Sequence, residues 1–167
     1  MAYRNRVYVA FDADSDIRYF NLMKAWKQHD GVSFSFNDAH ELKQARDSST
    51  EETIKRSLAE RLANSKVFIL LVGESTKYLY KFVRWEMEQA LRRGLPIVCV
   101  NLNGRRSQDS ASCPPILKEE LAMHISFGAN ILEHTLENWP SQYVELKAAQ
   151  KSGPYYYKDE IYDRIGG

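Results

Sequence analysis

A glutamate near the middle of the chain stands where a carboxylate could do chemistry. Glu86 lies in the stretch Val-Arg-Trp-Glu-Met at residues 83–87, which we expect to be helical. At about 100° per residue, Val83 and Met87 share an apolar stripe and Glu86 falls beside it, about 60° from Val83. A carboxylate at the edge of a buried face can point into a cleft, where partial desolvation strengthens its hydrogen bonds to ligand hydroxyls. Glu86 is therefore a candidate catalytic residue, although the same spacing is typical of a solvated helix residue.

Other polar residues follow two of the strands that we expect. Asp12 comes directly after the first strand and could bind a ribose or a phosphate-bound cation, or simply form a turn or cap a helix. Ser75 and Thr76 precede the helix of Glu86, where hydroxyls and free backbone N–H groups can meet a phosphate; plain capping is the alternative. In parallel sheets ligands bind beyond the carboxyl ends of the strands, so we expect the site there.

Several kinds of chemistry have no support in the sequence. There is no GxGxxG after the first strand, no GxxxxGK[ST] and no GxSxG, and the four histidines are scattered without the spacing of metal ligands. The net charge is +1, so the global balance gives no indication of nucleic acid or an acidic membrane as a partner. We expect neither a bound metal nor a resident cofactor.

A phosphate-accepting receiver is a weaker interpretation. Asp12 and Asp14 after the first strand are suggestive of an acidic magnesium pocket. Such a pocket also needs an acceptor aspartate after the central strand, and the residue there is Glu74. Glutamate is a poor substitute, which disfavours this interpretation.

The order of elements predicts an α/β fold, a three-layer, doubly wound parallel sheet. A continuous apolar run such as Val-Phe-Ile-Leu-Leu-Val is typical of a central strand that is covered on both faces. Strands alternate with amphipathic segments along the chain, which favours parallel crossover connections. The predicted strands are residues 6–11, 32–36, 66–72 and 96–100, and the predicted helices are residues 17–29, 49–64 (capped by Ser49) and 79–93.

The remainder of the chain gives weaker signals. We expect a long exposed loop over residues 37–48, a short helix near 116–122, a strand near 124–127 and a helix between Pro140 and Gln150. The tail from Tyr155 is rich in tyrosine and should pack back on the domain. The whole chain, residues 1–167, is expected to form a single domain. Unpaired cysteines and the lack of an apolar leader or 18-residue apolar window predict a cytoplasmic protein.

One long segment carries a recognisable pattern. Between residues 67 and 100, a strand ends in a Gly-x-x-Thr turn, a helix carries Val-x-Trp-Glu-Met, and a Pro-Ile strand follows. The residues of this pattern are Gly73, Thr76, Val83, Trp85, Glu86, Met87, Pro96 and Ile97. The segment resembles the third strand, third helix and fourth strand of a TIR domain, more narrowly the bacterial TIR-like family that includes the Thoeris anti-phage sensor. The resemblance covers roughly residues 5–101, and departs from the family at Ala10, where a serine is usual.

The resemblance implies an activity. Catalytic TIR domains cleave the nicotinamide–ribose bond of NAD, giving ADP-ribose or a cyclic signalling nucleotide, and their catalytic glutamate corresponds to Glu86. NAD would be a substrate, bound with the help of Phe11, Asp12, Asp38, Ser75 and Thr76. Phe11 could stack on nicotinamide or adenine, or simply close the core, and Asp38 falls in the loop that gates the site in TIR domains. The resemblance also implies a homo-oligomer and an effector protein that responds to the nucleotide signal.

A second function class stays open at this stage. A TIR-like domain can also act without catalysis, as a module that self-associates or docks to an effector. Ala10 in place of serine and the near-neutral charge are compatible with it.

Overall fold

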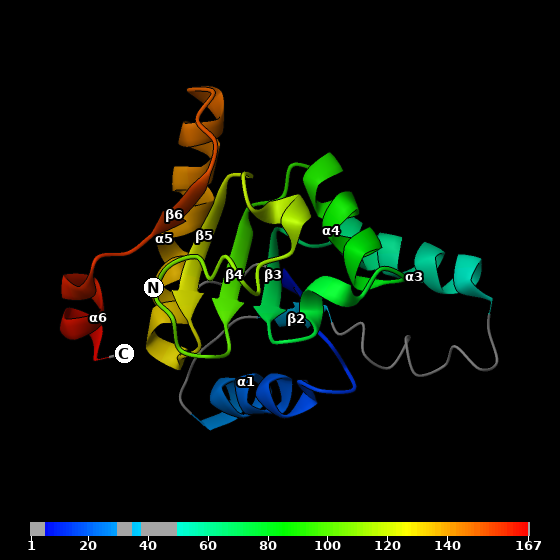
Figure 1. The fold of residues 1–167 in the computed structure, drawn as a ribbon, viewed down its shortest axis with the longest axis horizontal. Helices are drawn as coiled ribbons and strands as arrows, with labels where there is room; N and C mark the ends of the chain where they lie inside the picture. The colour runs from blue at the N-terminus through cyan, green and yellow to red at the C-terminus, as the bar shows by residue number, and fades with distance from the viewer. Residues whose placement is uncertain (1–5, 30–34, 38–49, 167) are drawn as a thin grey trace.

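The computed structural model describes residues 6–29, 35–37 and 50–166, and within them a parallel six-stranded sheet (Figure 1). The strands lie in the order β2-β1-β3-β4-β5-β6. They are β1 (Arg6–Ala10), β2 (Ser35–Asn37), β3 (Val67–Val72), β4 (Ile97–Asn101), β5 (Ala122–Ser126) and β6 (Pro154–Tyr156). The helices are α1 (Ile17–His29), α3 (Glu51–Ala63), α4 (Val83–Arg92), α5 (Ala129–Ala148) and α6 (Asp159–Ile165), with short 3-10 turns η2 (Thr76–Tyr78) and η3 (Pro115–Leu117).

Two apolar clusters cover the two faces of this sheet. One packs α1 and α5 against one face, and the other packs α3 and α4 against the opposite face (Figure 1). All six residues of β3 are buried, with Ile69 and Leu71 in the first cluster and Phe68 and Leu70 in the second. This alternation follows from the two-residue period of a strand covered on both sides. The predicted three-layer, doubly wound parallel fold is confirmed.

Two helix boundaries differ from the sequence-based prediction. Helix α3 is capped by Thr50 rather than Ser49, because the Thr50 side chain accepts the hydrogen bond of the Thr53 backbone N–H at 3.2 Å. The helix that carries Glu86 begins at Val83 rather than at residue 79. Residues 79–82 form an irregular segment between η2 and α4, a feature that the apolar spacing does not reveal. Of the predicted strand 32–36 only the last two residues are described, inside β2, and the predicted loop 37–48 lies almost entirely outside the described residues.

The C-terminal part is more regular than predicted. Helix α5 runs through Pro140, whereas the sequence suggested a helix that starts there. An interior proline costs about 3 kcal/mol, and burial of Trp139 before it and Tyr143 after it offsets this cost. In place of the predicted helix 116–122 there is the short turn η3, and β5 begins at Ala122, two residues before the predicted strand.

The tyrosine-rich tail packs back on the sheet, as predicted. Strand β6 pairs with the edge of β5, and Tyr162 of α6 is buried in the cluster formed by α1 and α5. The Tyr162 hydroxyl accepts a hydrogen bond from the Ser126 backbone N–H at 3.2 Å. None of the helices in the described ranges has both the length and the apolar character required to cross a bilayer.

Candidate functional site

The carboxyl edge of the sheet is where the chain can hold a ligand. Strand β2 lies on one side of β1, and β3, the next strand along the chain, lies on the other side. The strand order therefore reverses between β1 and β3. Ligands of open α/β sheets bind at such a point. Two cavities open here, one on each side of the turn that joins β1 to α1.

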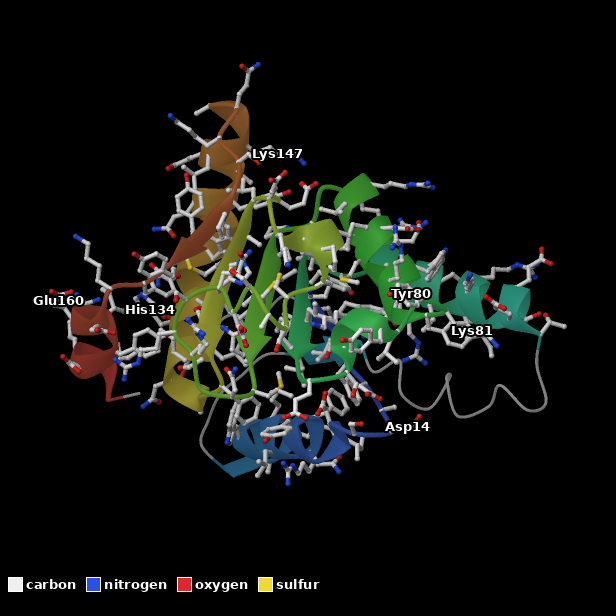
Figure 2. The ribbon with its side chains drawn as sticks, in the orientation of Figure 1. Asp14, Tyr80, Lys81, His134, Lys147 and Glu160 are labelled. Carbon is white, nitrogen blue, oxygen red and sulfur yellow. The ribbon has the colours of Figure 1, made fainter. Side chains whose placement is uncertain are left out.

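The first cavity lies between the β1–α1 turn and the segment that leads into α4. Its volume is about 280 Å³. Asp14 of the turn and Tyr80 and Lys81 of the segment lie on the same side of the molecule (Figure 2). The cavity is lined by Phe11, Asp12, Ala13, Asp14, Tyr78, Leu79, Tyr80, Lys81, Phe82 and Val83.

Phe11 and Asp12 both line this first cavity, although each also has a structural role. The Phe11 ring is buried and stacks on Phe20 with 4.8 Å between the ring centroids. The Asp12 Oδ1 atom accepts hydrogen bonds from the backbone N–H groups of Asp14 and Ser15, which fixes the turn. Both residues therefore help to hold the cavity wall in shape.

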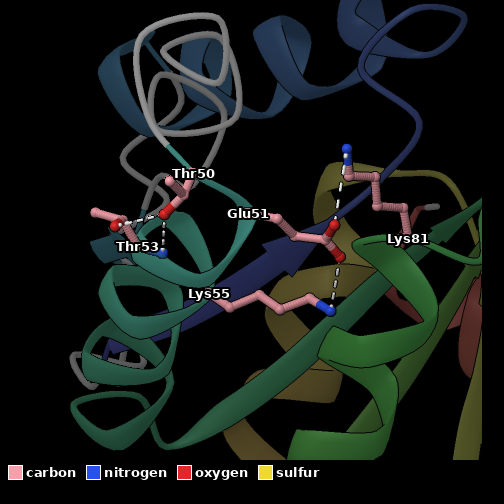
Figure 3. Close-up of polar contacts among 5 residues, drawn as sticks. All are labelled: Thr50, Glu51, Thr53, Lys55 and Lys81. Atoms are coloured by element: carbon pink, nitrogen blue, oxygen red, sulfur yellow. Dashed lines mark hydrogen bonds and ion pairs between the residues drawn. The ribbon is translucent and has the colours of Figure 1, made fainter.

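Lys81 ties the wall of the first cavity to the start of α3. Its Nζ atom lies 3.9 Å from Glu51, which also pairs with Lys55 at 3.0 Å (Figure 3). Tyr80 beside it is exposed. An exposed ion pair contributes little to stability, so this segment is only weakly fixed by it.

Glu86 lies deeper than the sequence suggested. The apolar spacing placed it at the edge of the buried face of its helix, but the structure buries the side chain completely in the first turns of α4. It is absent from the lining of both cavities, whereas Val83, one turn earlier on the same helix, lines the first. The arrangement brings Phe11 and Asp12 together but does not bring Glu86 to a cavity surface.

A tyrosine of β1 holds the Glu86 carboxylate, and sequence reasoning missed it. The Tyr8 hydroxyl donates a hydrogen bond to Glu86 Oε2 at 2.5 Å, across the interface between β1 and α4. Tyr8 is completely buried and stacks on Phe68. Burial, and then the charge and hydrogen bond of Glu86, raise the pKa of Tyr8 well above its usual value. A tyrosine in the otherwise apolar strand Val7-Tyr8-Val9 was the available signal, since a buried hydroxyl needs a polar partner.

The neighbouring residues Ser75 and Thr76 have different surroundings in the structure. The Thr76 hydroxyl is buried; it accepts a hydrogen bond from the Gly73 N–H at 2.9 Å and donates one to the Leu71 carbonyl at 3.2 Å. Thr76 therefore supports the turn after β3, whereas Ser75 lines the second cavity. Asp38, the remaining predicted site residue, lies outside the described residues.

The second cavity is larger, about 460 Å³, and lies at the predicted carboxyl edge of the sheet, but of the predicted site residues only Ser75 lines it. It is formed where the start of α1 faces the ends of β3 and β4. The available signals were an acidic residue just before a predicted helix and a glycine just after a predicted strand. The cavity is lined by Ser15, Asp16, Arg18, Tyr19, Val72, Gly73, Glu74, Ser75, Leu102, Asn103 and Ser112.

Asp16 is the unusual residue of this second cavity. It is 7% exposed, and within the described part of the chain its Oδ2 atom has no hydrogen-bond partner. Burial raises the pKa of Asp16, the negative charges of Asp12 and Glu74 add to the rise, and Arg18 opposes it. Glycine lets the end of β3 approach the carboxylate closely, because a Cβ atom on Gly73 would lie 2.3 Å from Oδ2 and would force one of them to shift.

Among the residues that the structure describes, no three or more His, Cys, Asp or Glu side chains are arranged to hold an ion.

The fold and the position of Glu86 on α4 define a class of protein, the TIR-like domains. Comparison with known families is more specific: the model of "Thoeris protein ThsB, TIR-like domain" matches residues 8–107, more than half of the 167 residues. The chain belongs to this family. The match spans β1 to β4 and includes Tyr8, Phe11 and Glu86, while β5 to α6 lie beyond it. A search of curated proteins gives no match.

Proposed function

We propose that the protein consumes NAD in anti-phage defence, cleaving the bond between nicotinamide and ribose with Glu86 as the catalytic carboxylate. The observation that carries the proposal is membership of the Thoeris ThsB TIR-like family over residues 8–107, a range that includes Glu86 on α4. The resemblance assigns the catalytic glutamate of TIR enzymes to this position.

The chemistry requires little acid catalysis. The bond from ribose C1′ to the pyridinium nitrogen breaks with both electrons going to nitrogen, so nicotinamide leaves neutral. C1′ then bonds to water, which releases a proton and gives ADP-ribose, or to an adenine nitrogen, which gives a cyclic isomer. The transition state resembles an oxocarbenium ion, and one carboxylate can stabilise its charge and hold the ribose hydroxyls.

The first cavity is the proposed entrance for the nicotinamide end of NAD. Phe11 offers an aromatic ring, and Asp12 and Asp14 offer negative charge to a cationic pyridinium. We propose that Ser75 and Thr76, in the turn before α4, contribute to NAD binding. Asp38 is included because the resemblance alone implies it. Because Glu86 is buried and lines neither cavity, reaction requires the 79–82 segment, which lines the first cavity, to shift and open a path to the carboxylate.

Assembly and signalling complete the proposal. The resemblance to TIR enzymes supports a homo-oligomer as the active form and an effector protein that responds to the nucleotide product. Tyr78 and Tyr80 are exposed beside the first cavity, where a second copy of the chain would be in contact with the moving segment. Exposed aromatic side chains are typical anchors of protein interfaces.

A second candidate function is a non-catalytic TIR-like module. The observation that favours it is the complete burial of Glu86 and its hydrogen bond with Tyr8, since a buried Tyr–Glu pair can serve the fold alone. In that case the exposed tyrosines would bind a partner, and no NAD would be consumed.

The test is the loss of NAD over time, with products separated by chromatography, at high protein concentration. The wild type is compared with Glu86→Gln, in which the amide oxygen can still accept the Tyr8 hydrogen bond and so preserve the fold. The matched control is Glu88→Gln on the same helix, where Glu88 is partly exposed and pairs with Arg84 at 3.1 Å.

We expect NAD loss by the wild type and the control and at least about a hundredfold less by Glu86→Gln, in line with the loss of a charge-stabilising group. Equal turnover by Glu86→Gln would remove Glu86 from catalysis. No turnover by any of the three proteins, including samples shown to be oligomeric, would favour the non-catalytic module.

A further inference from the structure

The Glu86 carboxylate, which the proposed reaction requires, lies where neither cavity of the sheet edge reaches it. Its side chain is completely buried and is absent from the lining of both cavities. The Tyr8 hydroxyl donates a hydrogen bond to Glu86 Oε2 at 2.5 Å, and Tyr8 is itself completely buried. The structure therefore shows a closed arrangement, in which the sheet holds this carboxylate away from the surface that a substrate can reach.

Tyr8 belongs to a rigid part of the molecule. It lies in β1, between β2 and β3, and is in register with Phe68 of β3. The rings of Tyr8 and Phe68 stack with 5.8 Å between their centroids, which fixes the direction of the hydroxyl. Burial raises the pKa of Tyr8 well above its usual value, so the hydroxyl keeps its proton and remains a donor at neutral pH.

Glu86 belongs to a helical turn that is held less firmly. It lies in the first turn of α4, where the N-cap residue, Phe82, offers no side-chain acceptor to the free N–H groups. A helix without a polar N-cap is less stable in its first turn. The preceding segment, residues 79–82, is irregular, and the ion pair between Lys81 and Glu51 is exposed and 3.9 Å long (Figure 3).

Two kinds of contact keep this turn on the sheet. Phe82 and Val83 are buried among apolar side chains on the face that α3 and α4 cover. The second contact is the Tyr8–Glu86 hydrogen bond, which joins the turn to β1. Residues 79–83 also line the first cavity, so a movement of this stretch is a short route between the carboxylate and that cavity.

We propose that the Tyr8–Glu86 hydrogen bond is an autoinhibitory contact, which keeps the first turn of α4 closed and the carboxylate away from NAD. When the bond breaks, the turn opens toward the first cavity, and ribose hydroxyls can replace Tyr8 as donors to the carboxylate. The inference rests on the proposed function, because burial of Glu86 is inhibitory only if Glu86 is catalytic.

Two other roles for Tyr8 predict different results. If Tyr8 oriented Glu86 for the reaction, loss of the hydroxyl would slow NAD cleavage in the folded enzyme. If Tyr8 only stabilised the fold, its loss would lower activity in proportion to the folded fraction. An autoinhibitory contact alone predicts that the folded variant is more active than the wild type.

The test compares the wild type with Tyr8→Phe, which removes the hydroxyl and keeps the ring that stacks on Phe68. A buried hydrogen bond to a charged acceptor is worth roughly tenfold or more in an equilibrium constant, so the open population should rise by that factor. The matched control is Tyr156→Phe, which removes the hydroxyl of an exposed tyrosine in the edge strand β6.

The first measurement is native-state hydrogen exchange at low urea concentrations, which does not depend on activity. Amides of residues 79–87, among them the Glu86 N–H that donates to the Phe82 carbonyl at 2.8 Å, should exchange roughly tenfold or more faster in Tyr8→Phe. Their exchange should depend weakly on urea, because local opening exposes little surface. The proposal is overturned by unchanged exchange over this segment, or by exchange as steeply dependent on urea as that of α5, which indicates opening only on global unfolding.

The second measurement is the loss of NAD per folded molecule. Since the rate scales with the population of the competent state, Tyr8→Phe should consume NAD roughly tenfold or more faster than the wild type. Tyr156→Phe should equal the wild type. Tyr8→Phe combined with Glu86→Gln should be as slow as Glu86→Gln alone, because the gain acts through the carboxylate. Turnover by Tyr8→Phe at or below that of the wild type would refute the autoinhibitory role.

The two measurements distinguish failure of this inference from failure of the proposed function. Faster local exchange in Tyr8→Phe, with no NAD loss by any of the proteins, would contradict NAD cleavage and support the restraint by Tyr8. NAD loss by the wild type, with no gain in Tyr8→Phe, would overturn the autoinhibitory contact and leave the proposed function intact.

Discussion

Two buried carboxylates lie on opposite sides of the first strand, and their surroundings differ. Glu86 on α4 lies among apolar side chains and accepts a hydrogen bond from Tyr8. Asp16, before α1, borders a polar cavity, and its Oδ2 has no donor within the described residues. The comparison teaches that burial alone does not mark a ligand site. The hydrogen bond from Tyr8 ties Glu86 to a neighbouring strand, whereas burial and the negative charges of Asp12 and Glu74 raise the pKa of Asp16.

The largest expected effect is the loss of stability on removal of the Glu86 carboxylate. Glu86→Ala leaves the Tyr8 hydroxyl without this acceptor and opens a hole in the core between α4 and β1. We expect a loss of about 3 kcal/mol in the free energy of unfolding, or roughly 6–12 °C in Tm. Chemical denaturation measures it. The control Glu88→Ala breaks only an exposed i,i+4 pair and should cost less than about 0.5 kcal/mol. A loss below 1 kcal/mol in Glu86→Ala would mean that the pair does not stabilise the fold.

The hydrogen bond alone can be isolated with Tyr8→Phe. This change removes the hydroxyl and keeps the ring that stacks on Phe68. We expect a loss of about 1.5–3 kcal/mol, because a buried bond to a charged acceptor is worth that much. Tyr80→Phe at an exposed position is the matched control and should be neutral. In a Glu86→Ala background the same Tyr8→Phe change should cost almost nothing, and a full cost there would refute the coupling.

On the Asp16 side, Gly73→Ala tests how closely the sheet approaches the carboxylate. The added Cβ atom would lie 2.3 Å from Oδ2, so Asp16 or the end of β3 must move. We expect a loss of about 1–3 kcal/mol, typical of overpacking. Asp16→Ala should relieve the clash, and the double variant should then be close to Asp16→Ala alone. Additive losses would show that the clash lies elsewhere.

The comparison also explains what the sequence could and could not predict. The parallel sheet was predictable, because a fully apolar run such as β3 identifies a central strand without knowledge of its neighbours. The full burial of Glu86 was not predictable from helix periodicity, since the Tyr8 hydroxyl that permits it comes from a strand 78 residues away. The start of α4 was missed because residues 79–82 carry an apolar spacing that fits a helix but form the irregular wall of the first cavity.

The candidate site was predictable in part. The carboxyl edge of the sheet followed from the fold, and Phe11 and Asp12 do line a cavity there. The second cavity combines residues from the β1–α1 turn with residues that follow β3 and β4, and no short motif encodes such a combination. Thr76 was predicted to contact a ligand because of its hydroxyl, but that hydroxyl is hydrogen-bonded within the turn after β3. Residue type can suggest a ligand contact, but tertiary structure decides whether the polar atom is available.

The smallest expected effect is a gain in stability, and it comes from replacement of Asp16. The raised pKa of Asp16 means that the folded state binds its proton more tightly than the unfolded state does. The stabilising contribution of the protonated group is therefore present at low pH and lost as pH rises through the folded pKa. At pH 7 the charged Asp16 lowers stability, so Asp16→Asn should raise the free energy of unfolding by about 0.5–1 kcal/mol.

The pH dependence distinguishes this explanation from a general effect of the substitution. The groups that act on Asp16 are Asp12, Glu74 and Arg18, and all three remain in the variant. The gain should therefore shrink as pH falls from 7 toward 4.5, because the wild-type carboxyl takes up its proton, while Asp163→Asn, which changes an exposed carboxylate on α6, should show no such trend. Urea unfolding at both pH values measures the difference. A loss of stability in Asp16→Asn at pH 7 would mean that the carboxylate supports the β1–α1 turn. A gain would mean that the charged carboxylate lowers the stability of the fold, as expected of a group that is buried beside the negative charges of Asp12 and Glu74.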